Sequence, residues 1–121
     1  LAEAFVGEDL RAVPLAGLIP GEIRMTKKLQ HFGYHEMETV CNSFMFPAGT
    51  HVRSHEFHYS EWLPGTSHPI QPVYRVAGRE EGFMSSRLIA SYQHLHFGFF
   101  PDMPARLIQQ IGSAKIAGAR V

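Results

Sequence analysis

The chain has 121 residues, a length that suits one small domain and is short for two. Hydrophobic residues make up 45% and charged residues 18%, so the chain can bury a core and lacks the composition of a disordered segment. The 11 basic and 11 acidic residues balance to a formal net charge of +0, which argues against a nucleic-acid-binding surface.

A single cysteine, Cys41, excludes an internal disulfide and any metal site built from several cysteines. The apolar stretches of the chain are too short to cross a bilayer. One cysteine also fits a reducing compartment. We therefore expect a cytoplasmic protein that binds neither membranes nor nucleic acids.

Regularly spaced Gly and Pro residues divide the chain into short segments, which is typical of strands joined by turns. At the start, residues 1–6 resemble the end of an amphipathic helix whose beginning is absent, because no capping residue precedes them. We expect strands at 13–18, 22–27, 32–40, 50–60, 72–76, 83–84 and 88–97. We expect turns or loops at 20–21, 47–49, 64–69 and 78–82, with 64–69 the most mobile.

A helix is predicted near the end of the chain, with Asp102 as its N-cap. Leu107, Ile108 and Ile111 then form one apolar stripe at helical spacing. Residues 112–121 are rich in small side chains, and we expect them to fray. The residues alone therefore predict a β-rich body with one C-terminal helix.

Eight histidines stand out, and four of them form two tight clusters, His55 with His58 and His94 with His96. Side chains alternate along a strand, so His94 and His96 are expected on one face. By the same rule Glu56 and His58 share a face. If the two strands pair or face each other, these side chains could converge on one site.

Two chemistries fit such a site. A His-x-His pair with a carboxylate and another histidine suits Zn, Fe or Mn, as in metal-binding β-domains. Alternatively, one histidine can act as the general base for a nucleophile. Cys41 has no glycine elbow around it, so we interpret it as a small buried or half-buried side chain rather than the nucleophile.

Several motifs occur in the order and spacing of one enzyme family, over almost the whole chain. The motifs lie at residues 16–20, 24–30, 32–34, 47–50, 54–60, 78–83 and 90–97. Together they resemble the part of the cobyrinic acid a,c-diamide synthases that follows the nucleophile.

The resemblance implies an α/β fold class, in which the complete domain is a flavodoxin-like three-layer class I glutamine amidotransferase domain. Residues 1–121 would be one incomplete domain that supplies its later, mostly antiparallel strands and its last helix. The family's nucleophile lies in a Glu-Cys-Gly-Gly-Leu-Met-Tyr-Leu-like elbow, which would end where Leu1 begins. We therefore expect the chain by itself to be inactive.

The function implied is the ATP- and glutamine-dependent conversion of the a- and c-carboxylates of a corrin precursor, cobyrinic or hydrogenobyrinic acid, to amides in cobalamin biosynthesis. ATP and Mg would bind a separate N-terminal synthetase domain, because this sequence has no Gly-x-x-x-x-Gly-Lys-Ser/Thr phosphate loop. Glutamine, the corrin and that domain would be the partners, and a homo-oligomer is compatible with the pattern.

Residue by residue, the resemblance matches His94 to the family's catalytic histidine, the first His of a Tyr-x-His-x-His-Phe segment. His96 would be a support residue in a packed strand. Class I amidotransferases usually carry an acid at the position of His96, so the resemblance implies a Cys–His dyad. Glu56 is the candidate to orient His94, with His58 beside it, and a structural role for Glu56 is equally open.

Three other interpretations stay open at this stage. One is a stand-alone metal-binding β-domain that uses His55, His58, His94 and His96. Another is a non-enzymatic domain that docks to partner subunits. In the third, a related enzyme amidates a nickel-bearing tetrapyrrole instead of a corrin.

Overall fold

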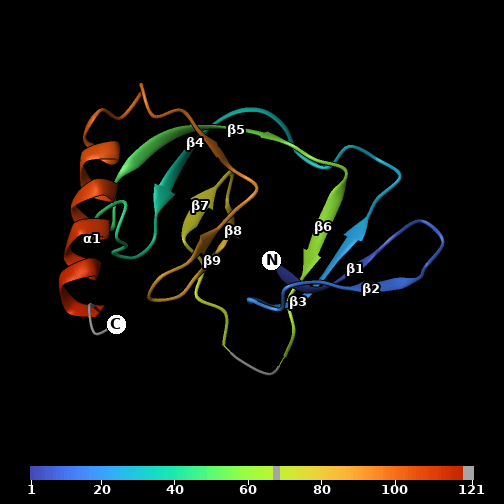
Figure 1. Ribbon diagram of the computed structural model, residues 1–121. Helices are drawn as coiled ribbons and strands as arrows, with labels where there is room; N and C mark the ends of the chain where they lie inside the picture. Colours follow the sequence, from blue (N-terminus) through green and yellow to red (C-terminus); the bar gives the residue numbers. More distant parts are fainter. Residues whose placement is uncertain (67–68, 119–121) are drawn as a thin grey trace.

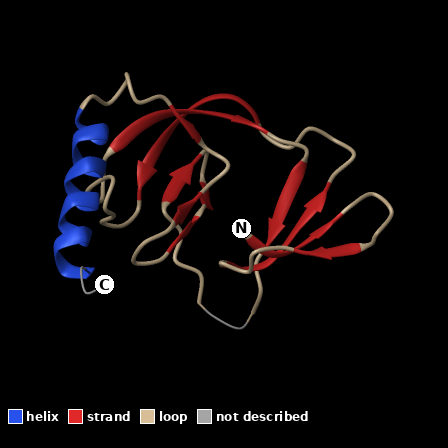
Figure 2. Cartoon of the chain, in the orientation of Figure 1, coloured by secondary structure: helices blue, strands red, loops and turns tan. Residues whose placement is uncertain are grey.

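The computed structural model describes residues 1–66 and 69–118, which form two larger sheets, a small two-stranded pair and one helix (Figure 1). The strands are β1 (Ala2–Val6), β2 (Ala12–Pro14), β3 (Ile19–Met25), β4 (Phe32–Thr39), β5 (His51–Phe57), β6 (Ser60–Leu63), β7 (Tyr74–Val76), β8 (Arg79–Glu81), β9 (Phe83–Met84), β10 (Ile89–Ala90) and β11 (His94–Leu95), and the helix is α1 (Asp102–Gly118). Figure 2 shows α1 and the β1–β3 region at opposite ends of the view. No helix among the described residues is long and apolar enough to span a membrane.

The N-terminal segment is a strand, so the helix expected at residues 1–6 is wrong. The four-stranded sheet has the order β2-β1-β3-β6, and β1 is paired on both sides, antiparallel to β2 and parallel to β3. Ala2 and Val6 are buried. A short apolar run has no clear helical or strand period, and here pairing along both edges decides the conformation.

The turn expected at residues 20–21 is a bulge inside β3. Ala2 pairs with Ile19 whereas Ala4 pairs with Glu22, so β3 carries an extra residue at this point. Gly21 has a φ of 96°, and a Cβ there would lie 2.1 Å from the carbonyl oxygen of Leu63. The close approach of the backbone of β6 therefore requires glycine.

The five-stranded sheet is antiparallel and has the order β11-β5-β4-β7-β8. Its central pair, β4 and β5, confirms the alternation in the sequence, because Met37, Val52 and Ser54 are buried while Arg53 and Phe57 are exposed. The buried face packs against a cluster of seven side chains, namely Met37, Phe46, Val52, Val73, Tyr74, Val76 and Met103.

The helix is confirmed, but the stripe predicted on it is not its buried face. Met103 is 1% exposed and belongs to the core, whereas Ile108 and Ile111 are 70% and 54% exposed. α1 therefore meets the sheet mainly through its first turn. Residues 112–118 are helical rather than frayed, and 119–121 lie outside the described residues, as do 67–68 of the expected mobile loop.

Two further segments differ from expectation. Residues 79–81 form β8 rather than part of a turn, since Val76 pairs with Arg79 across a two-residue loop, Ala77 and Gly78, with φ values of 48° and 77°. Positive φ at both positions is the geometry of a tight hairpin. Residues 88–97 form the short strands β10 and β11 instead of one long strand. The fold class is thus β-rich, with mixed and antiparallel sheets and a C-terminal helix.

Candidate active site

His94 lies on the short edge strand β11, where it pairs with His55 of β5. The two imidazole rings have centroids 6.1 Å apart, and Tyr34 of β4 packs edge-on to His55 at 5.1 Å. Tyr34 is 81% exposed and His94 is also exposed. The structure therefore presents His94 on an accessible face of the five-stranded sheet.

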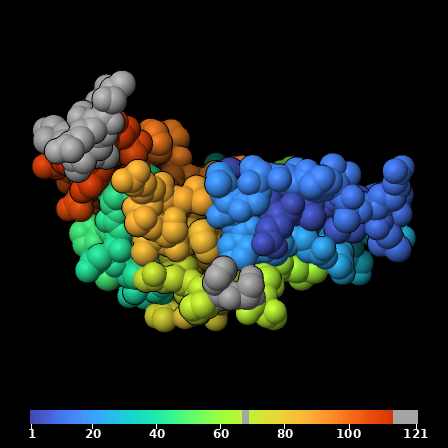
Figure 3. Space-filling model, turned by 60° about the horizontal axis from the view of Figure 1, so that its bottom comes forward, coloured from blue at the N-terminus to red at the C-terminus, as the bar shows by residue number. Residues whose placement is uncertain are grey.

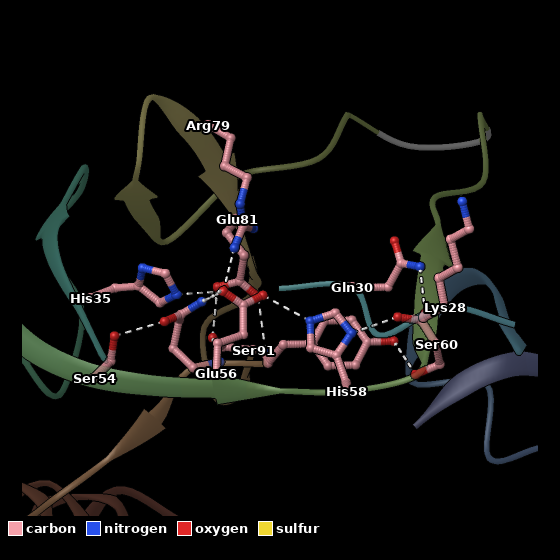
Figure 4. Close-up of polar contacts among 12 residues, drawn as sticks. Lys28, Gln30, His35, Ser54, Glu56, His58, Ser60, Arg79, Glu81 and Ser91 are labelled. Atoms are coloured by element: carbon pink, nitrogen blue, oxygen red, sulfur yellow. Dashed lines mark hydrogen bonds and ion pairs between the residues drawn. The ribbon is translucent and has the colours of Figure 1, made fainter. Parts of the chain in front are cut away.

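Glu56 lies on the opposite face of the same sheet, and it is fully buried. Its carboxylate accepts hydrogen bonds from His58 Nε2 at 2.8 Å and from Gln93 Nε2 at 2.6 Å, and it forms an ion pair with Arg79 (Figure 4). His35 Nε2 lies 3.9 Å from the same carboxylate. We call Glu56, His58, Arg79 and Gln93 the Glu56 cluster.

The charge of Glu56 is stabilised by these contacts. Burial alone would raise the pKa of the Glu56 carboxyl, but hydrogen bonds from His58 and Gln93 and the positive charge of Arg79 together hold it below the ordinary value of 4.5. Glu56 is therefore an ionised carboxylate at neutral pH.

The two histidine clusters meet only in part: His55 lies against His94, whereas His58 hydrogen-bonds to Glu56 instead. Neighbouring residues on a strand point to opposite faces, so Glu56 cannot share the face on which His55 meets His94. Glu56 contacts Gln93, the residue before His94, rather than His94 itself. Glu56 therefore does not touch His94 in this structure, and its role as an orienting residue stays a prediction.

His58 is placed as predicted on the same side as Glu56. Its Nδ1 lies 2.6 Å from the carbonyl oxygen of Ser60, and its ring stacks on Tyr92 with centroids 3.8 Å apart. Both ring nitrogens of His58 thus face acceptors, one a carbonyl and the other the Glu56 carboxylate. His58 fixes Glu56 and the residues that follow β5, and it does not approach His94.

His96 is not in a packed strand, because β11 ends at Leu95 and His96 is exposed. Its carbonyl accepts a hydrogen bond from the Phe99 amide at 2.9 Å, which closes a turn. A Cβ on Gly98 would come within 2.9 Å of the His96 ring. His96 therefore belongs to the turn that follows His94, which corrects its expected position.

Glu81 of β8 is a buried carboxylate that the sequence analysis did not single out. It accepts hydrogen bonds from Ser91 Oγ at 2.7 Å and from the Tyr92 amide at 2.8 Å. Burial raises the pKa of Glu81 despite these two hydrogen bonds. The only signal in the sequence was the pair of acids at 80–81, which also fits an exposed charged turn.

A cavity of ≈ 410 Å³ with a mixed polar and apolar lining adjoins the Glu56 cluster, with His31, Arg79, Glu81 and Tyr92 in its wall. A second, largely apolar cavity of ≈ 270 Å³ lies between the N-terminal strands and residues 81–83 and 90–92. Trp62 of β6 packs edge-on to Phe83 of β9 beside it, at 6.1 Å. Figure 3 shows this side of the molecule, where the orange segment lies against the blue N-terminal strands.

His35 and His58 both lie near the Glu56 carboxylate, whereas His55 and His94 lie together on the other face of the sheet. Within the described residues, no group of three or more His, Cys, Asp or Glu side chains is placed to hold a metal ion. Cys41 is half-buried, with its Sγ 3.5 Å from the carbonyl oxygen of Pro72. It lies beyond the end of β4. This position agrees with its interpretation as a packing residue.

Comparison with known proteins identifies the family. The model of the CobB/CobQ-like glutamine amidotransferase domain matches residues 2–101. The chain belongs to this family. It is 35% identical over 119 residues to the cobyrinate a,c-diamide synthase of Priestia megaterium, covering 95% of this chain and 25% of that protein.

Other relatives give the same result. The cobyrinate a,c-diamide synthase of Dehalococcoides mccartyi is 36% identical over 118 residues, or 90% of this chain and 25% of that protein. The synthase of Salmonella typhimurium is 36% identical over 95 residues, or 74% of this chain and 20% of that protein. The chain thus spans about a quarter of the length of these curated relatives. No solved structure matches.

Proposed function

We propose that this chain supplies the glutaminase histidine, His94, of an enzyme that amidates the a- and c-carboxylates of a corrin precursor in the cytoplasm. The observation that carries this proposal is the family match over residues 2–101, which includes the whole of β11. The accessible position of His94 on the sheet face supports it further, because a catalytic base must be within reach of its nucleophile.

In this proposal His94 transfers protons in an acyl-transfer reaction. The imidazole would take the proton of a cysteine thiol as the sulfur attacks the side-chain amide of glutamine. It would then give that proton to the departing ammonia, and water would hydrolyse the thioester to glutamate. The cysteine would come from a segment outside this chain, since Cys41 lies at the other end of β4 from the strand pair of His55 and His94.

We propose that ATP binds outside this chain, a proposal supported by the lack of a Gly-x-x-x-x-Gly-Lys-Ser/Thr phosphate loop in the sequence. ATP and Mg would activate the corrin carboxylates in a separate synthetase domain, which would receive the ammonia. Glutamine, the corrin and that domain are accordingly the partners that we propose. The role of His94 would be the same if the substrate were a cobalt-free or nickel-bearing macrocycle.

The test is a chimera in which this chain replaces the matching quarter of the P. megaterium synthase. His94→Ala should lower glutamine-dependent amidation by roughly 100-fold or more, the range for loss of a general acid–base group. Amidation driven by high concentrations of ammonia should persist, because it bypasses the glutaminase step. The rate of each reaction is measured by the formation of the corrin diamide.

His96→Ala is the matched control, since it removes an exposed histidine two residues away. It should lower the glutamine-dependent rate much less than His94→Ala does. If ammonia-dependent and glutamine-dependent rates fell together in His94→Ala, the assignment of His94 as the glutaminase base would have to be abandoned.

A further inference from the structure

The strand that carries His94 is too short to fix its own position. β11 has two residues, and it pairs with β5 at two positions, His94 with His55 and Leu95 with Ser54. Strand pairs of this length are marginally stable without other contacts. Side-chain contacts in the preceding residues 91–93 must therefore help to place His94.

Gln93 anchors this segment to the buried face of β5. The side chain is 6% exposed, and both ends of its amide are used. Its Oε1 accepts a hydrogen bond from Ser54 Oγ at 2.7 Å, and its Nε2 donates to Glu56 at 2.6 Å. Because Gln93 and His94 are consecutive, fixing the amide on one side of β5 fixes where His94 emerges on the other.

Glu81 anchors the two residues before Gln93. One carboxylate oxygen accepts from the Tyr92 amide at 2.8 Å, and the other accepts from Ser91 Oγ at 2.7 Å. The same hydroxyl oxygen accepts a hydrogen bond from the backbone N–H of Gln93 at 2.8 Å. The Glu81 carboxylate thus holds Ser91 and Tyr92 directly, and it holds the backbone of Gln93 indirectly through the Ser91 hydroxyl.

The two carboxylates are themselves connected. Arg79 lies two residues before Glu81 on β8 and forms the ion pair with Glu56. His58 bonds to Glu56 and stacks on Tyr92, so it contacts both halves of the arrangement. The anchors of residues 91–93 therefore come from two different strands, β5 and β8, and Figure 4 shows Glu56 and Glu81 close to Ser91.

We propose that Glu56 and Glu81 are positioning residues for His94, acting through Gln93 and Ser91 from the face of the sheet opposite to the imidazole. The proposal rests on the proposed function of His94. In this proposal no carboxylate orients the imidazole directly. The carboxylates instead fix the backbone segment that carries His94. Neither carboxylate touches the ring or the reacting atoms.

The first test measures the position of His94 in this chain without any assay of activity. Gln93→Ala removes the link to Glu56, and Ser91→Ala is a milder change that removes one of the two hydrogen bonds to Glu81 and leaves the one from the Tyr92 amide. Thr39→Val is the matched control, because Thr39 is equally buried on the same sheet but hydrogen-bonds Pro47 and Thr50 instead. NMR spectra of the His94 ring and amide exchange at residues 94–95 are recorded for each variant.

We expect Gln93→Ala and Ser91→Ala to shift the His94 ring resonances and to speed amide exchange at residues 94–95 by at least about tenfold relative to the control, as expected for local opening. Thr39→Val should lower the unfolding temperature without changing either signal. An unchanged His94 signal in both variants would overturn the proposal.

The second test uses the chimera with the P. megaterium synthase. Gln93→Ala should lower the glutamine-dependent kcat by about 10- to 100-fold, the loss that follows from a small misplacement of a catalytic group. The KM for glutamine and the ammonia-dependent rate should change little. The double variant E56Q/Q93E, which exchanges donor and acceptor, should recover part of the kcat lost in Q93E alone.

The two proposals fail in different ways. If His94→Ala leaves glutamine-dependent amidation intact, the proposed function is wrong, and the NMR measurements still decide whether residues 91–93 place His94. If His94→Ala abolishes that activity while Gln93→Ala behaves like Thr39→Val, the proposed function stands and the positioning role is refuted.

Discussion

At the scale of single residues, two buried carboxylates differ in how well their charge is compensated. Glu56 has an arginine, a histidine and an amide around it, which hold its pKa below the ordinary value of 4.5. Glu81 has a hydroxyl and a backbone amide, and burial raises its pKa. Ionised Glu56 therefore stabilises the fold, whereas ionisation of Glu81 opposes folding.

These opposite shifts predict opposite effects of pH on two matched variants. The stability contributed by Glu56 is present above its ordinary pKa of 4.5 and is lost as pH falls through its lower folded-state pKa. Glu56→Gln should thus cost about 3–5 kcal/mol at pH 7, because Arg79 and His58 lose their charged partner, and progressively less below pH 4.5.

Glu81→Gln should show the reverse trend. The folded-state pKa of Glu81 is raised, so the wild type loses stability as pH rises from 4.5 through that raised value. Over this pH window the free energy of unfolding of Glu81→Gln should increase relative to that of the wild type. Urea unfolding of the wild type and both variants at several pH values measures these differences. Parallel pH curves for Glu56→Gln and Glu81→Gln would contradict the opposite pKa shifts.

The sequence predicted which residues share a face, but not which strands meet. Alternation correctly placed Glu56 and His58 together, and they are hydrogen-bonded. The partner of His94 depends on register, and a shift of one residue would have put it on the face of Glu56 instead of that of His55. Register between segments forty residues apart is set by tertiary packing, which no local pattern in the chain records.

At the scale of elements, prediction succeeded where one face is buried and failed where the local signal was short. β4 and β5 alternate clearly and were found close to their observed bounds. β1 has no such period, and the Pro20-Gly21 turn signal lies in a bulge of β3. Turn residues favour a bulge as much as a turn, so composition alone cannot separate the two.

The bulge in β3 makes Gly21 a sensitive position. Gly21→Ala would place a Cβ 2.1 Å from the Leu63 carbonyl oxygen and 2.5 Å from the Gly65 amide nitrogen, both backbone atoms. Gly17 also has a positive φ, but nothing lies within 4 Å of its Cβ position. Gly17→Ala should therefore cost about 1–2 kcal/mol from backbone conformation alone, and Gly21→Ala clearly more. Equal losses in thermal or urea unfolding would refute the close approach of β6.

The helix provides a second element-scale prediction. Met103→Ala should cost about 2–5 kcal/mol, because it opens a cavity in the core against which α1 packs. Ile108→Ala, on the exposed face of the same helix, should change the free energy of unfolding by no more than about 0.5 kcal/mol. Urea unfolding measures both changes. A larger loss of stability in Ile108→Ala than in Met103→Ala would mean that the stripe predicted from the sequence is the buried face of α1 after all.

At the scale of the whole molecule, the five-stranded sheet separates two environments. Its buried face holds the core and the Glu56 cluster, and its other face exposes aromatic and histidine side chains around His94, including Phe32, Tyr34 and Phe57, which are 65%, 81% and 48% exposed. An exposed aromatic surface of this kind is typical of a contact region. The accessible side chain of His94 lies within this aromatic surface.

The last prediction concerns glutamine hydrolysis by the 121-residue chain alone. Its one thiol, Cys41, lies past the end of β4, and the five residue steps from Tyr34 to Thr39 alone span about 17 Å along the strand, so Cys41 and His94 lie toward opposite ends of the sheet. The chain should therefore show no glutaminase activity, and Cys41→Ala should behave like the wild type. Glutamate release is the measurement, with the chimera as positive control. Activity that disappears in Cys41→Ala would show that the nucleophile has been misplaced.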